Sequence, residues 1–236
     1  MLPSSLTVRP LALLLDAGDT MLFMDYEALS QALSSLSVPV SPERLERSMF
    51  VAKSAYQTVV REKAQHESGW FALVRSLLLE AGLARAQAEP LLVPLRKQHD
   101  DFYFWRKVPS ELPEALRRAR EAGIRLGVVS NSEGRLVSVL QRVGLASHME
   151  VMIDSQLEGV SKPDPEIFAR ALFRMHLPSD RAVYAGDLPE IDLVGAAAAG
   201  MHGVLIDAFD HYRARPDLPR FASVAELVDA LVRLPR

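Results

Sequence analysis

Residues 11–20 read Leu-Ala-Leu-Leu-Leu-Asp-Ala-Gly-Asp-Thr, an apolar run that stops at an acidic, glycine-containing segment. The run does not alternate between apolar and polar residues, which is typical of a strand buried on both faces of a parallel sheet. Such a strand places Asp16 at its carboxyl end, where loop amides can face an anion. An aspartate after a strand is also common as a turn or capping residue, so this stretch alone leaves both interpretations open.

Four later apolar runs follow the same pattern, and each ends at polar residues. They are residues 124–129 before Ser130-Asn131, 151–153 before Asp154, 182–185 before Gly186-Asp187, and 203–206 before Asp207. Helical patterns lie between them at residues 111–122, 135–143, 165–175 and 191–199, several of them followed by glycine, the usual helix stop. The alternation predicts an α/β fold with a doubly wound, Rossmann-like parallel sheet.

Residues 25–106 interrupt this alternation. They contain no strand-like apolar run, and their patterns indicate amphipathic helices around residues 29–36, 43–63, 70–80 and 90–104. We therefore expect a Rossmann-like core of residues 1–24 and 107–236 and a smaller, all-helical domain of residues 25–106.

The composition excludes several classes of protein. A chain of 236 residues with 49% hydrophobic content can bury a large core, which argues against disorder. A net charge of -3 without a basic stripe argues against a nucleic-acid partner and a polybasic membrane anchor. The absence of cysteine excludes disulfides and thiolate chemistry. The first apolar run is too short to span a membrane and does not resemble a signal peptide, so we expect a cytoplasmic protein.

Two of the polar segments suit an anion. Ser130-Asn131 offers a hydroxyl, an amide and, with a helix expected to begin near Ser132, free backbone N–H groups, although an ordinary helix cap fits equally well. Lys162 comes just before a helix signalled by Asp164 as N-cap and Pro165 as first residue, so its ammonium group can turn inward.

A third segment suits a metal ion. Asp187 and Asp192, five positions apart around a loop, offer the hard oxygen ligands that Mg²⁺ prefers, although Asp192 also fits as an acid at a helix N-terminus. Like charges about 4 Å apart repel by roughly 4 kcal/mol at an effective dielectric constant near 20. Carboxylates beside a bound anion therefore require compensation, which Lys162 and a divalent cation could supply.

Taken in order and at these separations, the four segments resemble the haloacid dehalogenase-like hydrolases, and the resemblance spans nearly the whole chain. It implies that Asp16 is the catalytic nucleophile and that Lys162 is a second catalytic residue. The phosphate-binding residues that it implies are Ser130, Asn131, Lys162 and Gly18.

The resemblance also implies a cofactor and a role for the helical insertion. Mg²⁺ would be held by Asp16, Asp187, Asp192 and the backbone carbonyl of Gly18. The insertion of residues 25–106 corresponds to what the family calls a cap.

The sequence departs from the family pattern at Gly18. Phosphatases of this family usually carry an aspartate there, which protonates the leaving oxygen and later activates water. A backbone carbonyl is enough for the metal, but glycine cannot give the general acid–base help that is typically worth about 10²–10⁴ in rate. Asp19 is the candidate to replace this acid, and Thr20 fits the pattern.

Three functions are compatible with these features. The first is a Mg²⁺-dependent phosphohydrolase that forms an aspartyl-phosphate on a small phosphomonoester. The second is a weakly active or inactive member that binds a phosphorylated ligand, for which Gly18 is the evidence. The third is a metal-independent 2-haloacid dehalogenase, against which Asp187 argues. The expected partner is a small phosphorylated metabolite, and the expected assembly is a monomer or homodimer.

Overall fold

The computed structural model describes residues 1–63 and 66–236, with the side chains of all of these except residues 54–63 and 66–68. The chain divides into two compact units. One consists of Met1–Phe23 and Lys107–Arg236, and the other of Met24–Arg106. Because the second unit is inserted into the first, the sheet-forming unit is built from two separate stretches of sequence.

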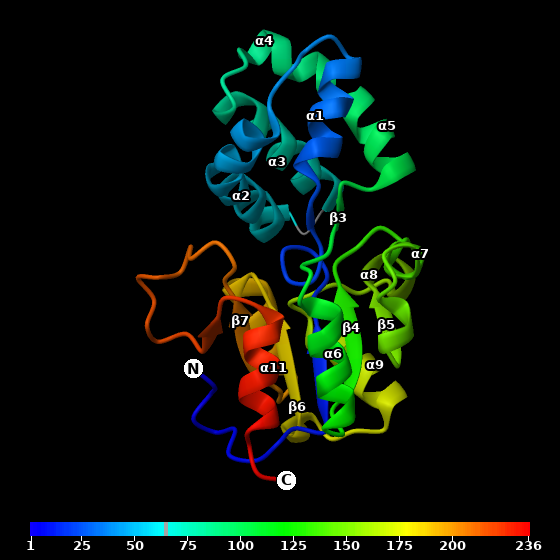
Figure 1. Cartoon of the computed structure of the whole chain (residues 1–236), viewed down its shortest axis with the longest axis vertical. Coiled ribbons are helices and arrows are strands. Elements are labelled where there is room, and N and C mark those ends of the chain that lie inside the picture. The colour runs from blue at the N-terminus through cyan, green and yellow to red at the C-terminus, as the bar shows by residue number, and fades with distance from the viewer. Residues whose placement is uncertain (64–65) are drawn as a thin grey trace. The chain divides into compact units, whose positions relative to one another are not determined.

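A six-stranded parallel sheet forms the centre of the first unit (Figure 1). Its strands are β1 (Ala12–Leu15), β4 (Arg125–Ser130), β5 (Val151–Asp154), β6 (Ala182–Gly186), β7 (His202–Ile206) and β8 (Arg220–Phe221). Their order is β5-β4-β1-β6-β7-β8, and each neighbouring pair is parallel. The order reverses direction between β1 and β6, which is the switch point where doubly wound sheets bind ligands. The predicted α/β fold is confirmed.

The register brings the polar ends of the central strands to one edge. Leu15 of β1 lies beside Val128 of β4 and Ala185 of β6. Asp16 therefore lies level with the carboxyl ends of both neighbouring strands. All four residues of β1 are fully buried, as its uninterrupted apolar run predicts.

Helices cover both faces of the sheet. α6 (Leu112–Glu121) and α11 (Val224–Val232) pack against each other on one face (Figure 1). α9 (Pro165–Met175) and α10 (Val194–Ala198) contribute to a buried apolar cluster that includes Leu14 and Tyr184. The remaining helical elements are α7 (Leu136–Arg142), α8 (Ser155–Glu158), the 3₁₀ turns Ala146–His148 and Ser179–Arg181, and the π-helix Pro189–Leu193.

One helix begins later than the sequence predicts. α7 starts at Leu136 rather than near Ser132, because the backbone N–H groups of Gly134 and Leu136 donate to the carboxylate of Asp154 at the end of β5. This acid fixes residues 132–135 as a loop.

The second unit is helical. It contains α1 (Tyr26–Ser35), α2 (Pro42–Lys63), α3 (His66–Glu80), α4 (Arg85–Ala88), the 3₁₀ turn Glu89–Leu91 and α5 (Leu92–Phe102). Its own apolar core includes Leu29, Trp70 and Leu95. β2 (Phe23–Met24) and β3 (Trp105–Lys107) form a two-stranded sheet where the chain enters and leaves this unit. Among the described helices, none is both long and apolar enough to cross a membrane.

Candidate active site

Asp16 follows directly from β1 at the switch point of the sheet. Its backbone N–H donates to the carbonyl of Ala185 at 2.8 Å, which extends the pairing of β1 and β6 by one residue. Its side chain is only 10% exposed. The sequence therefore holds a carboxylate in a fixed and nearly dry position at the ligand-binding edge of the sheet.

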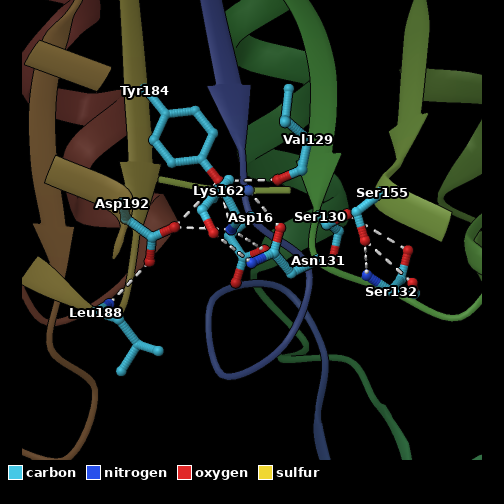
Figure 2. A network of polar contacts seen from close by, with 10 residues as sticks. All are labelled: Asp16, Val129, Ser130, Asn131, Ser132, Ser155, Lys162, Tyr184, Leu188 and Asp192. Carbon is cyan, nitrogen blue, oxygen red and sulfur yellow. Dashed lines mark hydrogen bonds and ion pairs between the residues drawn. The ribbon is translucent and has the colours of Figure 1, made fainter. Parts of the chain in front are cut away.

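Lys162 supplies the cation of this site, although it lies in the loop before α9 (Figure 2). Its ammonium group donates to Oδ1 of Asp16 at 2.7 Å, to Oδ1 of Asp192 at 2.7 Å and to the hydroxyl of Tyr184 at 2.9 Å. An ammonium group has three N–H donors, so all of them are engaged. Lys162 links the loop after β1 to the segment after β6.

Asp192 lies inside the π-helix that follows β6. Its Oδ2 accepts a hydrogen bond from the backbone N–H of Leu188 at 2.8 Å (Figure 2). A Cβ placed on Gly186 would lie only 2.3 Å from the carboxyl carbon of Asp192, so this position must be glycine for the carboxylate to lie against the strand end. The Gly-Asp sequence after β6 thus has a steric reason.

Three acids form a group that could hold a metal ion. Asp16, Asp187 and Asp192 are all buried, and each offers an oxygen within 4.8 Å of the others. Three carboxylates outnumber the single ammonium of Lys162, and their hard oxygens match the preference of Mg²⁺. The three buried acids therefore fit a divalent cation.

Burial and the charges of neighbouring groups together account for the pKa directions of Asp16 and Lys162. Burial, followed by the charge of Asp192, raises the pKa of Asp16 even though Lys162 opposes the shift. Burial alone would lower the pKa of Lys162, but the carboxylates of Asp16 and Asp192 more than offset it and raise that pKa. Lys162 is therefore an ammonium throughout the neutral range.

Ser130 and Asn131 lie at the end of β4 beside the site, and the structure uses the Asn131 side chain in an unexpected way. The Asn131 amide donates to the backbone carbonyl of Lys162 at 3.0 Å and accepts from the backbone N–H of Lys162 at 2.8 Å. These two bonds anchor the backbone of Lys162. The sequence predicts a phosphate contact for this amide, whereas here it positions the lysine. Ser130 is buried at the strand end.

Three backbone N–H groups in the loop after Asn131 have partners within the protein. Ser132 donates its backbone N–H to Oγ of Ser155 at 3.0 Å, and the Ser155 hydroxyl donates to the carbonyl of Ser132 at 3.1 Å. Asp154 accepts from the N–H groups of Gly134, Leu136 and Gln156. The N–H groups of Ser132, Gly134 and Leu136 are therefore bonded within the protein, and the anion-binding role expected of Ser130 and Asn131 stays a prediction.

The loop after Asp16 contains the departure from the family pattern. Asp19 is partly exposed, has a positive φ of 51° and donates its backbone N–H to the carbonyl of Leu22 at 2.8 Å. Gly18 forms an isolated bridge with Leu22. Thr20 is buried, and its hydroxyl has no hydrogen-bond partner. The structure therefore does not bring the carboxylate of Asp19 into the buried group of Asp16, Asp187 and Asp192.

Tyr184 and Asp154 contribute to the site although sequence reasoning assigned them no role. Tyr184 lies within an apolar strand, where an aromatic residue is normally interpreted as part of the hydrophobic core. The available signal was its hydroxyl, because a buried tyrosine usually finds a hydrogen-bond partner. Asp154 ends a strand in the same way as Asp16, and this shared position was a signal that it belongs to the same edge.

Comparison with known proteins identifies the family. A family model described as "haloacid dehalogenase-like hydrolase" matches residues 12–200, which include all four segments of the site. The chain is 36% identical over 138 residues to "Haloacid dehalogenase-like hydrolase domain-containing protein 3" of Bos taurus, an alignment that covers 58% of this chain and 55% of the relative. The match thus spans about half the length of that relative.

Two further comparisons found a similar phosphatase sequence and a solved structure of similar fold. It is 31% identical over 176 residues to the glyceraldehyde 3-phosphate phosphatase of Methanopyrus kandleri, covering 73% of this chain and 70% of the relative. Its fold matches the magnesium-bound structure of YfnB from Bacillus subtilis with a TM-score of 0.70 at 18% identity, covering 94% of this chain and 99% of that one.

Proposed function

The chain belongs to the haloacid dehalogenase-like hydrolases, and from this premise we propose that it is a Mg²⁺-dependent phosphohydrolase acting on a small phosphomonoester. The observation that carries the proposal is the buried group in which Lys162 bridges Asp16 and Asp192 while Asp187 lies beside them. A single carboxylate at a strand end could equally be a turn or capping residue. A nucleophile, a fixed cation and an excess of acids together suit the transfer of a phosphoryl group.

Asp16 performs the covalent step. One carboxylate oxygen attacks phosphorus, the bond from phosphorus to the ester oxygen breaks, and the leaving alkoxide takes the electron pair and is protonated by solvent water, because Gly18 offers no acid. Water then attacks the aspartyl-phosphate at phosphorus, which releases inorganic phosphate and restores the carboxylate. Lys162 holds Asp16 in position through its 2.7 Å hydrogen bond and offsets its charge.

The proposed metal site consists of Asp16, Asp187, Asp192 and the backbone carbonyl of Gly18. When bound, Mg²⁺ would neutralise negative charge on the phosphoryl oxygens and allow the anionic nucleophile and the anionic substrate to approach. The three mutually close carboxylates support this assignment. The magnesium in the YfnB structure and the phosphatase activity named for the M. kandleri relative are consistent with it.

The helical unit of Met24–Arg106 is the proposed cap. Its position in the sequence between β1 and β4, the two strands that deliver Asp16 and Ser130, supports this role. We propose that it selects the leaving group of a small phosphorylated metabolite, and that the enzyme needs no nucleic acid or membrane partner.

Gly18 favours one alternative, a member of low turnover that binds a phosphorylated ligand. A phosphate-release screen over sugar phosphates, nucleotides and short organic phosphates, with Mg²⁺ or with chelator, separates the two. The proposed function predicts release that requires Mg²⁺ and is lost in Asp16→Asn. Asp229→Asn is the matched control, because Asp229 is half exposed on α11 and pairs with Arg118.

The screen has two outcomes that contradict the proposal. Phosphate release that persists in chelator would exclude the metal role, and binding without any turnover would support the alternative. Chloride release from 2-chloropropionate without metal would instead identify a dehalogenase.

A further inference from the structure

Tyr184 is a fully buried residue of β6 for which the chemistry above gives no role. Its ring packs edge-on against Phe168 of α9, with ring centroids 4.8 Å apart and planes at 89°. This contact fixes the ring within the apolar core. The hydroxyl, however, reaches out of that core into the group around Lys162 (Figure 2).

The hydroxyl of Tyr184 has three partners that belong to different segments of the site. It accepts a hydrogen bond from the ammonium of Lys162 at 2.9 Å and donates to the carbonyl of Val129 at 2.8 Å, with Oδ1 of Asp192 as a second acceptor at 3.3 Å. Val129 immediately precedes Ser130 in β4. Tyr184 therefore extends from β6 past the end of β1 and joins the cation to the strand end that carries Ser130.

This link completes the restraint on Lys162. Its backbone is held by Asn131 and its ammonium by two carboxylates, which leaves one N–H donor to be satisfied. The hydroxyl oxygen of Tyr184 accepts a hydrogen bond from that remaining N–H. Its ring also lies 5.4 Å from the ammonium nitrogen, so an uncharged partner fills the side of the cation that faces the core.

We propose that Tyr184 is a positioning residue for phosphoryl transfer, whose hydroxyl sets the orientation of the Lys162 ammonium and couples it to the strand end at Ser130. The proposal rests on the phosphohydrolase function above. Without the hydroxyl, the third N–H of Lys162 and the carbonyl of Val129 lose their partner in a buried place, and the ammonium can turn away from Asp16. Because a small displacement of a nucleophile affects the chemical step more than ligand binding, kcat should change while KM does not.

Tyr184→Phe tests this directly, because it keeps the ring and removes only the hydroxyl. With p-nitrophenyl phosphate and saturating Mg²⁺, we expect kcat to fall about 10- to 100-fold. We expect KM to stay within about twofold. Phe168→Leu is the matched control, since it loosens the same packing without touching the polar link. It should lower thermal stability while kcat at a permissive temperature is retained. An unchanged kcat in Tyr184→Phe, or an equal loss of kcat in Phe168→Leu, would overturn the proposal.

A second measurement does not depend on turnover. Hydrogen-bonded, buried lysine ammonium protons exchange slowly and can be observed by ¹H–¹⁵N NMR, and the Lys162 signal is assigned by its loss in Lys162→Met. We expect it in the wild type and expect it to broaden or vanish in Tyr184→Phe. Persistence of an unchanged signal in Tyr184→Phe would refute the link even if the wild type hydrolyses no phosphate ester, an outcome that would itself count against the phosphohydrolase function.

Discussion

The ammonium of Lys162 lies 2.7 Å from Oδ1 of Asp16, although 146 positions separate the two residues in the chain. Their side chains are 3% and 10% exposed, so each replaces water as the partner of the other's charge. Oδ1 of Asp192 contacts the same ammonium at 2.7 Å. The orientation of the proposed nucleophile therefore depends on a cation contributed by a distant loop.

Replacing Lys162 with Met should affect both stability and activity. The variant leaves the carboxylates of Asp16 and Asp192 without their shared cation, and breaking a buried ion pair typically costs about 3–5 kcal/mol. We expect a fall of that order in the free energy of unfolding by urea at pH 7, with Mg²⁺ restoring part of it. Phosphate release should fall to background. Wild-type stability and turnover in this variant would show that the pair has no such role.

Gly186→Ala tests the steric reason for the Gly-Asp sequence after β6. The new Cβ would meet the carboxyl carbon of Asp192 at 2.3 Å and displace that side chain from Lys162 and Leu188. Gly127→Ala is the matched control, because its Cβ would overlap Val151 and Leu14 in the apolar core instead. Overpacking should destabilise both variants by about 1–3 kcal/mol. Only Gly186→Ala should also weaken Mg²⁺ binding, measured by calorimetry, and an equal weakening in Gly127→Ala would contradict this explanation.

The missing acid at Gly18 predicts a dependence on the leaving group. Alkyl phosphates need a proton on the departing oxygen and should react slowly, whereas p-nitrophenyl phosphate hardly needs one. Gly18→Asp should therefore raise kcat for alkyl esters more than for the nitrophenyl ester. Asp19→Ala in the same assay tests the substitute acid, and a selective loss of alkyl turnover would assign it that role. Equal effects of Gly18→Asp on both substrates would argue against a missing acid.

Asp25 predicts a pH dependence of stability. It caps α1 by accepting from the N–H of Ala28 at 3.1 Å and pairs with Arg106 at 2.8 Å. Partial burial alone would raise the pKa of Asp25, but the hydrogen bonds from Arg106 and Ala28 lower it below the ordinary value of 3.8. A lowered folded-state pKa stabilises the protein above the unfolded-state pKa, and this stability is lost as the pH falls through the folded-state value.

We therefore expect Asp25→Ala to lower the free energy of unfolding by about 1 kcal/mol at pH 7. The difference from wild type should shrink below about pH 4. Urea unfolding from pH 3 to pH 7 measures it, and a difference that grows toward acid pH would contradict the assignment.

The sheet could be predicted from the sequence because its central strands are buried on both faces. Residues 12–15, 126–129 and 182–185 are continuously apolar, and each of these runs ends close to a polar residue at the edge of the sheet. β8 offers no such signal, since Arg220 and Phe221 are only partly buried. α11 was likewise outside the sequence-based prediction.

The contacts within the site could be predicted only in part. Residue types and order indicated that Asp16, Lys162 and Asp187 act at one edge of the sheet. The start of α7 depends instead on Asp154, which accepts a hydrogen bond from Leu136. The hydrogen bonds of the Asn131 side chain likewise depend on the backbone of Lys162, which only the fold brings close. Local sequence cannot reveal a hydrogen bond whose geometry is set by two separate strands.

The most direct test of the central claim asks whether Asp16 becomes phosphorylated. The protein is mixed with p-nitrophenyl phosphate and Mg²⁺, quenched in acid within milliseconds, and examined by mass spectrometry of the peptide that contains Asp16. The account predicts one added phosphoryl group on Asp16 that hydroxylamine removes and that is absent from Asp16→Asn and from chelator-treated protein. Turnover with no phosphoryl group on Asp16, or with one on another residue, would contradict it.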